Sequence, residues 1–260
     1  MKVLHKGFNY SQDGPGNRLV YHLQGCNFAC KWCSNADSIP RHNPKAYDVS
    51  INALLDEILR SRMMFFDGGG VTFTGGEATL QAEELIELLS LLKENGIHTC
   101  IETNGSSSRF AQIVDMVDYL IVDMKHFDDD EHKKWVGASL GEVKRNIEYC
   151  FSSGRQIHIR IPVINGVNVN PSAFAEYFAS FDTDNAVFEF LAYHEYGKDK
   201  WQGGYQIENG FVTDMVEKPQ NPKTNLAAFA SYIYRKDTVP MIKKYLDEGN
   251  KPDAPGFFPS

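Results

Sequence analysis

The sequence predicts an α/β fold in which parallel strands form a partial barrel. Short aliphatic runs alternate with amphipathic segments, and this alternation implies parallel strands joined by right-handed helical crossovers. We expect six such units, too few to close a full (β/α)8 barrel. A partial (β/α)6 barrel is therefore favoured over a doubly wound sheet, which the same periodicity would also produce. Residues 1–260, with 42% hydrophobic and 23% charged residues, are expected to form a single domain.

The expected strands and helices alternate along the chain. The strands are short aliphatic or β-branched runs, at residues 18–23, 71–74, 98–102, 119–124, 156–161 and 187–192. The helices carry apolar residues at helical spacing, at residues 52–64, 82–94, 142–151, 173–181 and 226–248. The second helix ends at Asn95-Gly96, a common signal for a helix C-terminus. Residues 202–260 are expected to be a C-terminal extension that packs on the barrel.

Composition and charge exclude several classes of protein. The formal net charge of −8 leaves no basic excess to neutralise phosphates, which argues against a nucleic-acid binder. The chain has no run of 18 apolar residues and no apolar N-terminal signal sequence. We therefore expect a cytoplasmic protein that does not span a membrane. We also expect a monomer. Five cysteines are too few for a disulfide framework, and the isolated Cys100 and Cys150 are expected to be core thiols.

The other three cysteines lie within eight positions, at Cys26, Cys30 and Cys33. Thiolates are soft ligands that favour iron–sulfur clusters, zinc or copper. Iron–sulfur electron carriers normally use a fourth cysteine, so a cluster held by this trio would keep one iron open to another ligand. A structural zinc site completed by His22 or His42, and a buried trio without metal, are the alternatives.

Polar or glycine residues follow the ends of the expected strands. They are Cys26, Gly75-Gly76-Glu77, Thr103-Asn104-Gly105, Lys125, Asn165-Gly166 and His194. In parallel α/β folds the ligand site lies at the carboxyl ends of the strands. We therefore expect these residues to meet at one rim of the sheet.

Eight motifs together resemble one known family. They are DGPGNR at 13–18, QGCNFACKWCSN at 24–35, GGGVTFTGGEATLQ at 68–81, ETNG at 102–105, DMK at 123–125, DDEHKKWVG at 129–137, IRIPVINGVN at 159–168 and YHEYGKDKW at 193–201. As a set they resemble the activating enzymes of glycyl radical enzymes, within the radical SAM superfamily, over about residues 10 to 201. The resemblance implies the parallel partial barrel of radical SAM type.

The resemblance also implies a reaction and its cofactors. Cys26, Cys30 and Cys33 would hold a 4Fe–4S cluster whose open iron binds S-adenosylmethionine. Reductive cleavage of that cofactor would give a 5′-deoxyadenosyl radical, which takes a hydrogen atom from a backbone glycine of a partner enzyme. A small-molecule radical SAM lyase or isomerase and a non-catalytic iron–sulfur electron carrier are the alternative functions.

Further site residues follow from the resemblance. Trp32 would lie beside the adenine, and Gly75, Gly76 and Glu77 would hold the methionyl amino group, where glycines allow a close backbone approach. Lys125 and Arg160 would line the cavity, and His194 would lie beside S-adenosylmethionine, so we expect His194 and Lys125 to join the cysteines in catalysis. Plainer interpretations are a packing role for Trp32, a strand-ending turn for the glycines, solvated charges for the basic residues and a structural histidine.

The resemblance places a monovalent cation near the substrate carboxylate, at Thr103, Asp123 and the backbone near Ile121. Glu102 stands where the family pattern has Asp, and its side chain is one methylene longer. That difference argues against the cation site. Asp123 would then be a simple carboxylate at the end of a strand.

Two segments would face the partner enzyme, through Asp13, Gly14 and Arg18 in one and through His132 and Gly137 in the other. The second segment also fits a charged exposed turn or helix start. The chain has no cysteine-rich ferredoxin-like insert, so we expect flavodoxin or ferredoxin to supply electrons directly. The sequence leaves the partner open among pyruvate formate-lyase, a paralogous glycyl radical enzyme and anaerobic ribonucleotide reductase.

Overall fold

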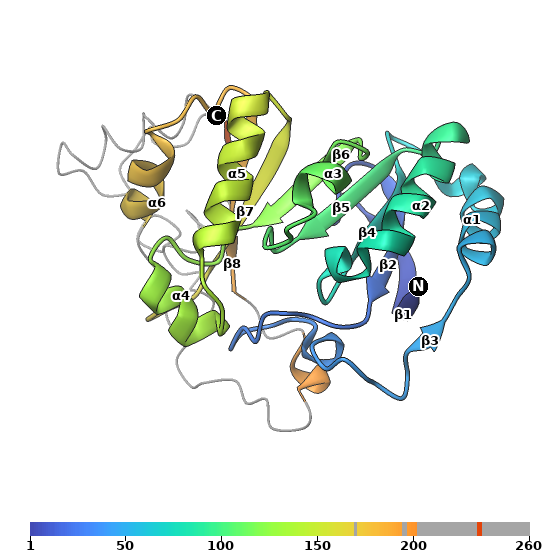
Figure 1. Ribbon diagram of the computed structural model, residues 1–260, viewed down its shortest axis with the longest axis horizontal. Helices are drawn as coiled ribbons and strands as arrows, with labels where there is room; N and C mark the ends of the chain where they lie inside the picture. The colour runs from blue at the N-terminus through green and yellow to red at the C-terminus, as the bar shows by residue number, and fades with distance from the viewer. Residues whose placement is uncertain (169–170, 194–196, 202–232, 236–260) are drawn as a thin grey trace, which may run out of the picture. The chain divides into compact units, whose positions relative to one another are not determined.

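The protein has an α/β fold in which most strands pair in parallel, as the sequence predicts (Figure 1). The computed structural model describes residues 1–168, 171–193, 197–201 and 233–235. The chain divides into two compact units, the first with residues 1–29 and 35–122, the second with residues 30–34 and those from 123 onward. No helix among the described residues is both long enough and apolar enough to cross a membrane.

The described strands of the first unit lie in the order β3-β1-β2-β4-β5-β6. Their bounds are β1 Lys2–Tyr10, β2 Asn17–Leu23, β3 Tyr47–Asp48, β4 Gly70–Gly75, β5 Thr99–Thr103 and β6 Tyr119–Asp123. Strands β2, β4, β5 and β6 pair in parallel with their neighbours. Strand β4 is buried along nearly its whole length, as is usual for a central strand of a parallel sheet with both faces covered.

Helices α1 (Ile51–Arg60), α2 (Ala82–Glu94) and α3 (Phe110–Val114) belong to the same unit. Helix α2 contacts β5 and its two neighbouring helices, and α1 lies beside it (Figure 1). The side chains of Leu85, Leu88, Leu89 and Leu92 are fully buried, at the spacing of one helical face. This strong periodicity explains why the predicted bounds of α2 are correct.

Strand β1 is not among the strands that the sequence predicts. Val3 and Leu4 in its first half are buried, and most of its second half is exposed. The run KVLHKGFNY therefore shows no regular alternation of buried and exposed residues. Antiparallel pairing makes it a strand, in a register that joins Val3 to Leu23 and Tyr10 to Asn17. The parallel sheet therefore has an antiparallel edge that the sequence pattern does not indicate.

The second unit contains α4 (Asp129–Val136), α5 (Gly141–Ser153), β7 (Ile157–Val163), α6 (Pro171–Phe178), β8 (Ala186–Ala192) and β9 (Ile233–Arg235). Strands β7 and β8 pair in parallel along seven residue pairs. Helix α5 buries Val143, Ile147, Cys150 and Phe151 on one face. The side chain of Asn185 joins this helix to the start of β8, because its Nδ2 donates to the Cys150 carbonyl at 2.8 Å.

Strand β9 corrects the helix predicted for residues 226–248. The structure describes only residues 233–235 of that range, and these three form a strand antiparallel to β8. The helix predicted from the apolar spacing is wrong for these residues, because backbone pairing with β8 determines their local structure. Ile233 and Tyr234 also favour strands by their β-branched and aromatic side chains. The remaining residues of the predicted helix lie outside the described part of the chain.

Truncating Leu88 tests whether the buried face of α2 stabilises the first unit. Leu88→Ala should lower the free energy of unfolding by about 2–5 kcal/mol, the usual effect of truncating a buried leucine. Leu80 is 51% exposed, so Leu80→Ala should change it by less than about 0.5 kcal/mol. Denaturant unfolding measures both, and equal effects would contradict the packing described for α2.

Candidate active site

The glycine pair at the end of β4 brings this strand against the cysteine loop. Gly75 has a φ of +114°, and a Cβ placed on Gly76 would lie 2.0 Å from the Gly25 carbonyl oxygen. The backbone N–H of Gly76 donates to Leu23 at 2.9 Å, and that of Glu77 donates to Gly25 at 2.8 Å. Residues without side chains are therefore needed where the turn meets the residue before Cys26.

The carboxylate of Glu77 links the end of β4 to the end of β5. It is 1% exposed and accepts hydrogen bonds from the backbone and hydroxyl of Thr79, at 3.0 and 2.5 Å. The Thr103 hydroxyl donates to it at 2.7 Å, and so does the Asn104 backbone, also at 2.7 Å. Burial of this carboxylate is thus balanced by four donors. Binding of a methionyl amino group stays a prediction, and the structure gives Glu77 a role in holding the loop.

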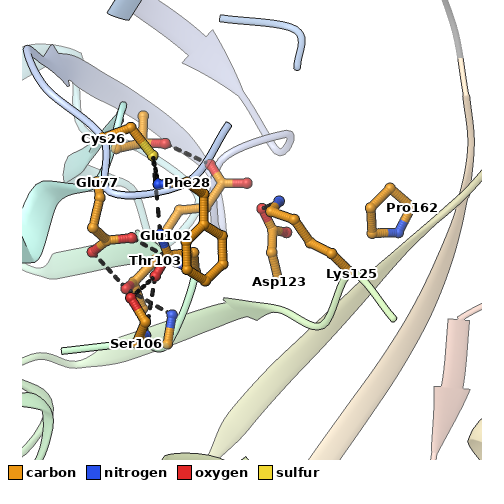
Figure 2. A network of polar contacts seen from close by, with 12 residues as sticks. Cys26, Phe28, Glu77, Glu102, Thr103, Ser106, Asp123, Lys125 and Pro162 are labelled. Carbon is orange, nitrogen blue, oxygen red and sulfur yellow. Dashed lines mark hydrogen bonds and ion pairs between the residues drawn. The ribbon is translucent and has the colours of Figure 1, made fainter. Parts of the chain in front are cut away.

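The sulfur of Cys26 lies in the same network of polar contacts (Figure 2). The backbone N–H of Phe28 points to it at 3.4 Å, and Nδ2 of Asn104 lies 4.0 Å away. Asn104 also bonds Asn27 and Ser106. From the sequence, Asn104 is expected at the rim only as part of Thr103-Asn104-Gly105, and no role is expected for Asn27 or Ser106. Their clustering comes from the meeting of two loops, which no local pattern indicates.

Cys30 and Cys33 belong to the second unit, in a loop that α4 holds in place. The backbone N–H of Lys31 donates to the Trp135 carbonyl at 3.1 Å, and that of Cys33 donates to Cys30 at 3.3 Å. Trp32 is 4% exposed, which fits the packing interpretation and leaves its contact with adenine a prediction.

Gly197, from the motif at 193–201, supports the same loop. A Cβ on Gly197 would lie 2.2 Å from the Ser34 carbonyl oxygen. This position therefore needs glycine, which explains one residue of the motif by packing alone. His194 lies outside the described residues.

Lys125 and Asp123 form an ion pair of 2.9 Å in the second unit. Burial by itself lowers the pKa of Lys125, but Asp123, Cys30 and Cys33 raise it more, so its pKa lies above the ordinary lysine value. Lys125 is therefore an ammonium close to two of the three clustered cysteines. The solvated-charge interpretation does not fit its side chain, which is 14% exposed.

Arg160 contacts a carboxylate that the sequence analysis does not single out. Its Nε donates to Glu189 at 2.8 Å, and His158 contacts the same oxygen at 3.0 Å. Burial raises the pKa of Glu189, but His158 and Arg160 outweigh it, so this pKa lies below the usual carboxyl value. Arg160 is 8% exposed and is thus a fixed, buried cation rather than a solvated one.

Of the residues expected to face a partner, Arg18 is fully buried. Its Nε donates to the Thr72 hydroxyl at 2.7 Å, and its other nitrogens donate to Val71 and Pro15 carbonyls at 2.6 and 3.1 Å. Gly14, with φ +113°, lies against this side chain, and Asp13 contacts Asn9. Arg18 therefore holds the loop before β2, and any effect on a partner would act through that loop.

His132 is also fully buried, so the exposed-turn interpretation does not fit this residue of α4. Its Nδ1 lies 2.6 Å from the Ala138 carbonyl, and burial lowers its pKa. Gly137 ends the helix in a left-handed conformation, with φ 79°. Asp128 caps the other end, where it accepts from the backbones of Asp130 and Glu131. Both predicted partner residues thus shape the helix and its end, and partner contact stays a prediction.

The donor set suits an iron–sulfur cluster. None of the five cysteines, all of which lie in the described part of the chain, forms a disulfide, and Cys26 lies beside N–H donors of the kind that stabilise cluster sulfurs. Among the described residues no three His, Cys, Asp or Glu side chains are gathered as a metal site. Joint ligation by Cys26, Cys30 and Cys33 therefore stays a prediction.

The monovalent cation, against which the longer side chain of Glu102 argues, also stays a prediction. Two of its expected ligands bind protein groups, because the Thr103 hydroxyl donates to Glu77 and Asp123 bonds Lys125. The Glu102 carboxylate accepts from the Thr74 hydroxyl.

Comparisons with known proteins find a family and several relatives that this chain resembles. A family model described as Radical SAM superfamily matches residues 20–178. Pyruvate formate-lyase 1-activating enzyme of Escherichia coli strain K12 is 34% identical over 197 residues, which cover 73% of this chain and 79% of that protein. Pyruvate formate-lyase-activating enzyme of Clostridium pasteurianum is 34% identical over 200 residues, which cover 73% of this chain and 81% of that protein.

A solved structure shares the fold. Streptococcus suis SuiB bound to S-adenosylmethionine matches with a TM-score of 0.56 and 16% identity, over 89% of this chain and 48% of that chain. The match therefore spans about half the length of SuiB, and at this identity the likeness concerns the fold.

Adding a methyl group at Gly76 should disrupt the turn that holds the cysteine loop. Gly76→Ala places a Cβ against the Gly25 backbone, so the free energy of unfolding should fall by about 1–3 kcal/mol or more. Gly7→Ala is the matched control, because nothing lies within 4 Å of a Cβ there. Thermal unfolding compares them, and a Gly76 variant as stable as the control would refute the close approach.

Acid titration tests the lowered pKa of Glu189. Its stabilising effect should be complete above the unfolded carboxyl pKa of about 4.3 and should be lost as the pH falls below that value. Glu189→Gln should therefore destabilise the protein at neutral pH and flatten the decline of unfolding free energy below about pH 4. Leu80→Ala, at an exposed position and without loss of a carboxyl group, should retain the wild-type slope. A Glu189 variant with an unchanged slope would contradict this interpretation.

Proposed function

Since the chain belongs to the radical SAM superfamily, we propose that it activates a glycyl radical enzyme similar to pyruvate formate-lyase. Its cofactors are a 4Fe–4S cluster and S-adenosylmethionine. The matched residues cover 79% of the E. coli relative. Flavodoxin or ferredoxin is the proposed electron donor.

The observation that carries this proposal is the pair of backbone hydrogen bonds between the cysteine loop and the Gly75-Gly76-Glu77 turn. The backbones of Gly76 and Glu77 bond to Leu23 and Gly25, immediately before Cys26. Cys26, the expected cluster ligand, and the turn expected to hold the methionyl group would therefore be held together by the backbone. An electron carrier would need the thiols but not this turn.

A bound cluster would supply the electron for reductive cleavage of S-adenosylmethionine, and this radical chemistry would remove a hydrogen atom from a glycine of the partner. The chain's own residues would bind the cluster and S-adenosylmethionine and orient them. Cys26, Cys30 and Cys33 would hold the cluster, and Lys125 would place a positive charge near two of these sulfurs. Arg160, held by Glu189, would line the cavity as a second fixed cation.

The function is tested by anaerobic reconstitution with iron and sulfide, followed by dithionite and S-adenosylmethionine. We expect 5′-deoxyadenosine, and with pyruvate formate-lyase present we expect the electron paramagnetic resonance (EPR) signal of a glycyl radical. Cys30→Ala should lose the cluster and both products. Cys150→Ala is the matched control, because this fully buried thiol lies in α5, away from the cysteine motif, and should keep both.

The outcomes separate the candidate functions. Formation of 5′-deoxyadenosine without a glycyl radical on any glycyl radical enzyme tested would favour a small-molecule substrate. A stable cluster that yields no 5′-deoxyadenosine would favour electron transfer and contradict the proposal. Equal loss of iron in the Cys30 and Cys150 variants would contradict the assignment of the cysteine motif.

A further inference from the structure

We propose that Asn104 is a positioning residue for Cys26, and that its side-chain amide, directed at the Cys26 sulfur, raises the reduction potential of the cluster. The inference rests on the proposed function, because it takes Cys26 to be an iron ligand. It goes beyond that function by assigning a task to a residue outside the cysteine motif. All residues that carry it belong to the first unit.

Asn104 forms a closed ring of hydrogen bonds with Asn27 and Ser106. Its Nδ2 donates to Oδ1 of Asn27 at 2.9 Å, and Nδ2 of Asn27 donates to the Ser106 hydroxyl at 2.7 Å. The Ser106 hydroxyl donates in turn to Oδ1 of Asn104 at 2.6 Å. Because Asn27 directly follows Cys26, the ring joins the cysteine loop to the loop after β5.

The ring permits one orientation of the Asn104 amide. Oδ1 of Asn104 accepts from both the backbone and the hydroxyl of Ser106, at 3.0 and 2.6 Å. A rotated amide would turn its NH2 group toward the donating backbone N–H of Ser106 and its oxygen toward Oδ1 of Asn27. The NH2 group must therefore face Asn27 and Cys26.

The backbone of Asn104 is fixed as firmly as its side chain. Its N–H donates to the Glu77 carboxylate at 2.7 Å, and the Thr103 hydroxyl donates to the same carboxylate. Asn104 is 5% exposed, so water does not compete freely for these contacts. An anchored backbone and an oriented amide are the conditions for a defined position of the donor relative to Cys26.

The consequence for the cluster is electrostatic. Nδ2 of Asn104 lies 4.0 Å from the Cys26 sulfur, where its N–H groups present positive charge. Reduction adds negative charge to a cluster and its sulfur ligands, so nearby N–H donors stabilise the reduced state more than the oxidised state. Loss of the donor should therefore make reduction harder.

The test is a redox titration of reconstituted variants, followed by the EPR signal of the reduced cluster. Asn104→Asp keeps the shape and the acceptor for Ser106 but replaces the donor with a charged oxygen, and Asn104→Leu removes the polar group. Both should lower the midpoint potential, and Asp should lower it more. Ser106→Ala, which removes one of the two hydrogen bonds that orient the Asn104 amide and keeps the backbone one, should lower it less. Asn95→Leu, the same change at an exposed helix end, should leave it unchanged.

Iron and sulfide contents are measured on each variant before the titration. A wild-type chain that binds no cluster would overturn the proposed function itself. A full cluster with an unchanged potential in both Asn104 variants would overturn only the role of Asn104. Should Asn104→Leu fail to fold, the near-isosteric Asn104→Asp and Ser106→Ala still decide, since an unchanged potential in both contradicts the inference.

Discussion

The site in the first unit depends on the contact between the backbones of Gly76 and Gly25. No side chain fits there, so the end of β4 lies directly on the residue that precedes Cys26. Two hydrogen bonds, to Leu23 and Gly25, fix this contact. The direction in which Glu77 leaves the turn is set by the same bonds. The hydrogen bonds of Glu77 to the loop after β5 therefore depend on the contact between Gly76 and Gly25.

Each unit contains a carboxylate that organises its neighbours. Glu77 gathers donors from its own turn and from the loop after β5. In the second unit, Glu189 holds Arg160 and His158. A buried carboxylate is costly unless donors or cations compensate it, and when it is compensated it holds them in one arrangement. The groups that bind these two carboxylates are thus held by the protein itself.

The sequence predicts elements well where one local signal dominates. Helix α2 has four buried leucines on one face and an Asn-Gly stop, so its predicted bounds are correct. Strands β1 and β9 are formed by antiparallel pairing with β2 and β8, and pairing partners are not encoded in a short window. The site shows the same division. The glycine pair and the cysteine loop stand out in the sequence, whereas the bonds of Asn104 to Asn27 and Ser106 join loops far apart in the chain.

Charged residues inside otherwise apolar strands indicate which strands pair and in which register. Arg160 interrupts IHIRIPV, and Glu189 interrupts AVFEFLA. In the parallel register of β7 and β8 these two residues lie directly opposite each other. A buried charge needs a partner, and opposite charges at matching depth in two successive strands identify both the pairing and its register. The same reasoning explains why Arg160 is buried and fixed, although the sequence of β7 alone is also compatible with a solvated charge. Its position is decided by a residue on the neighbouring strand.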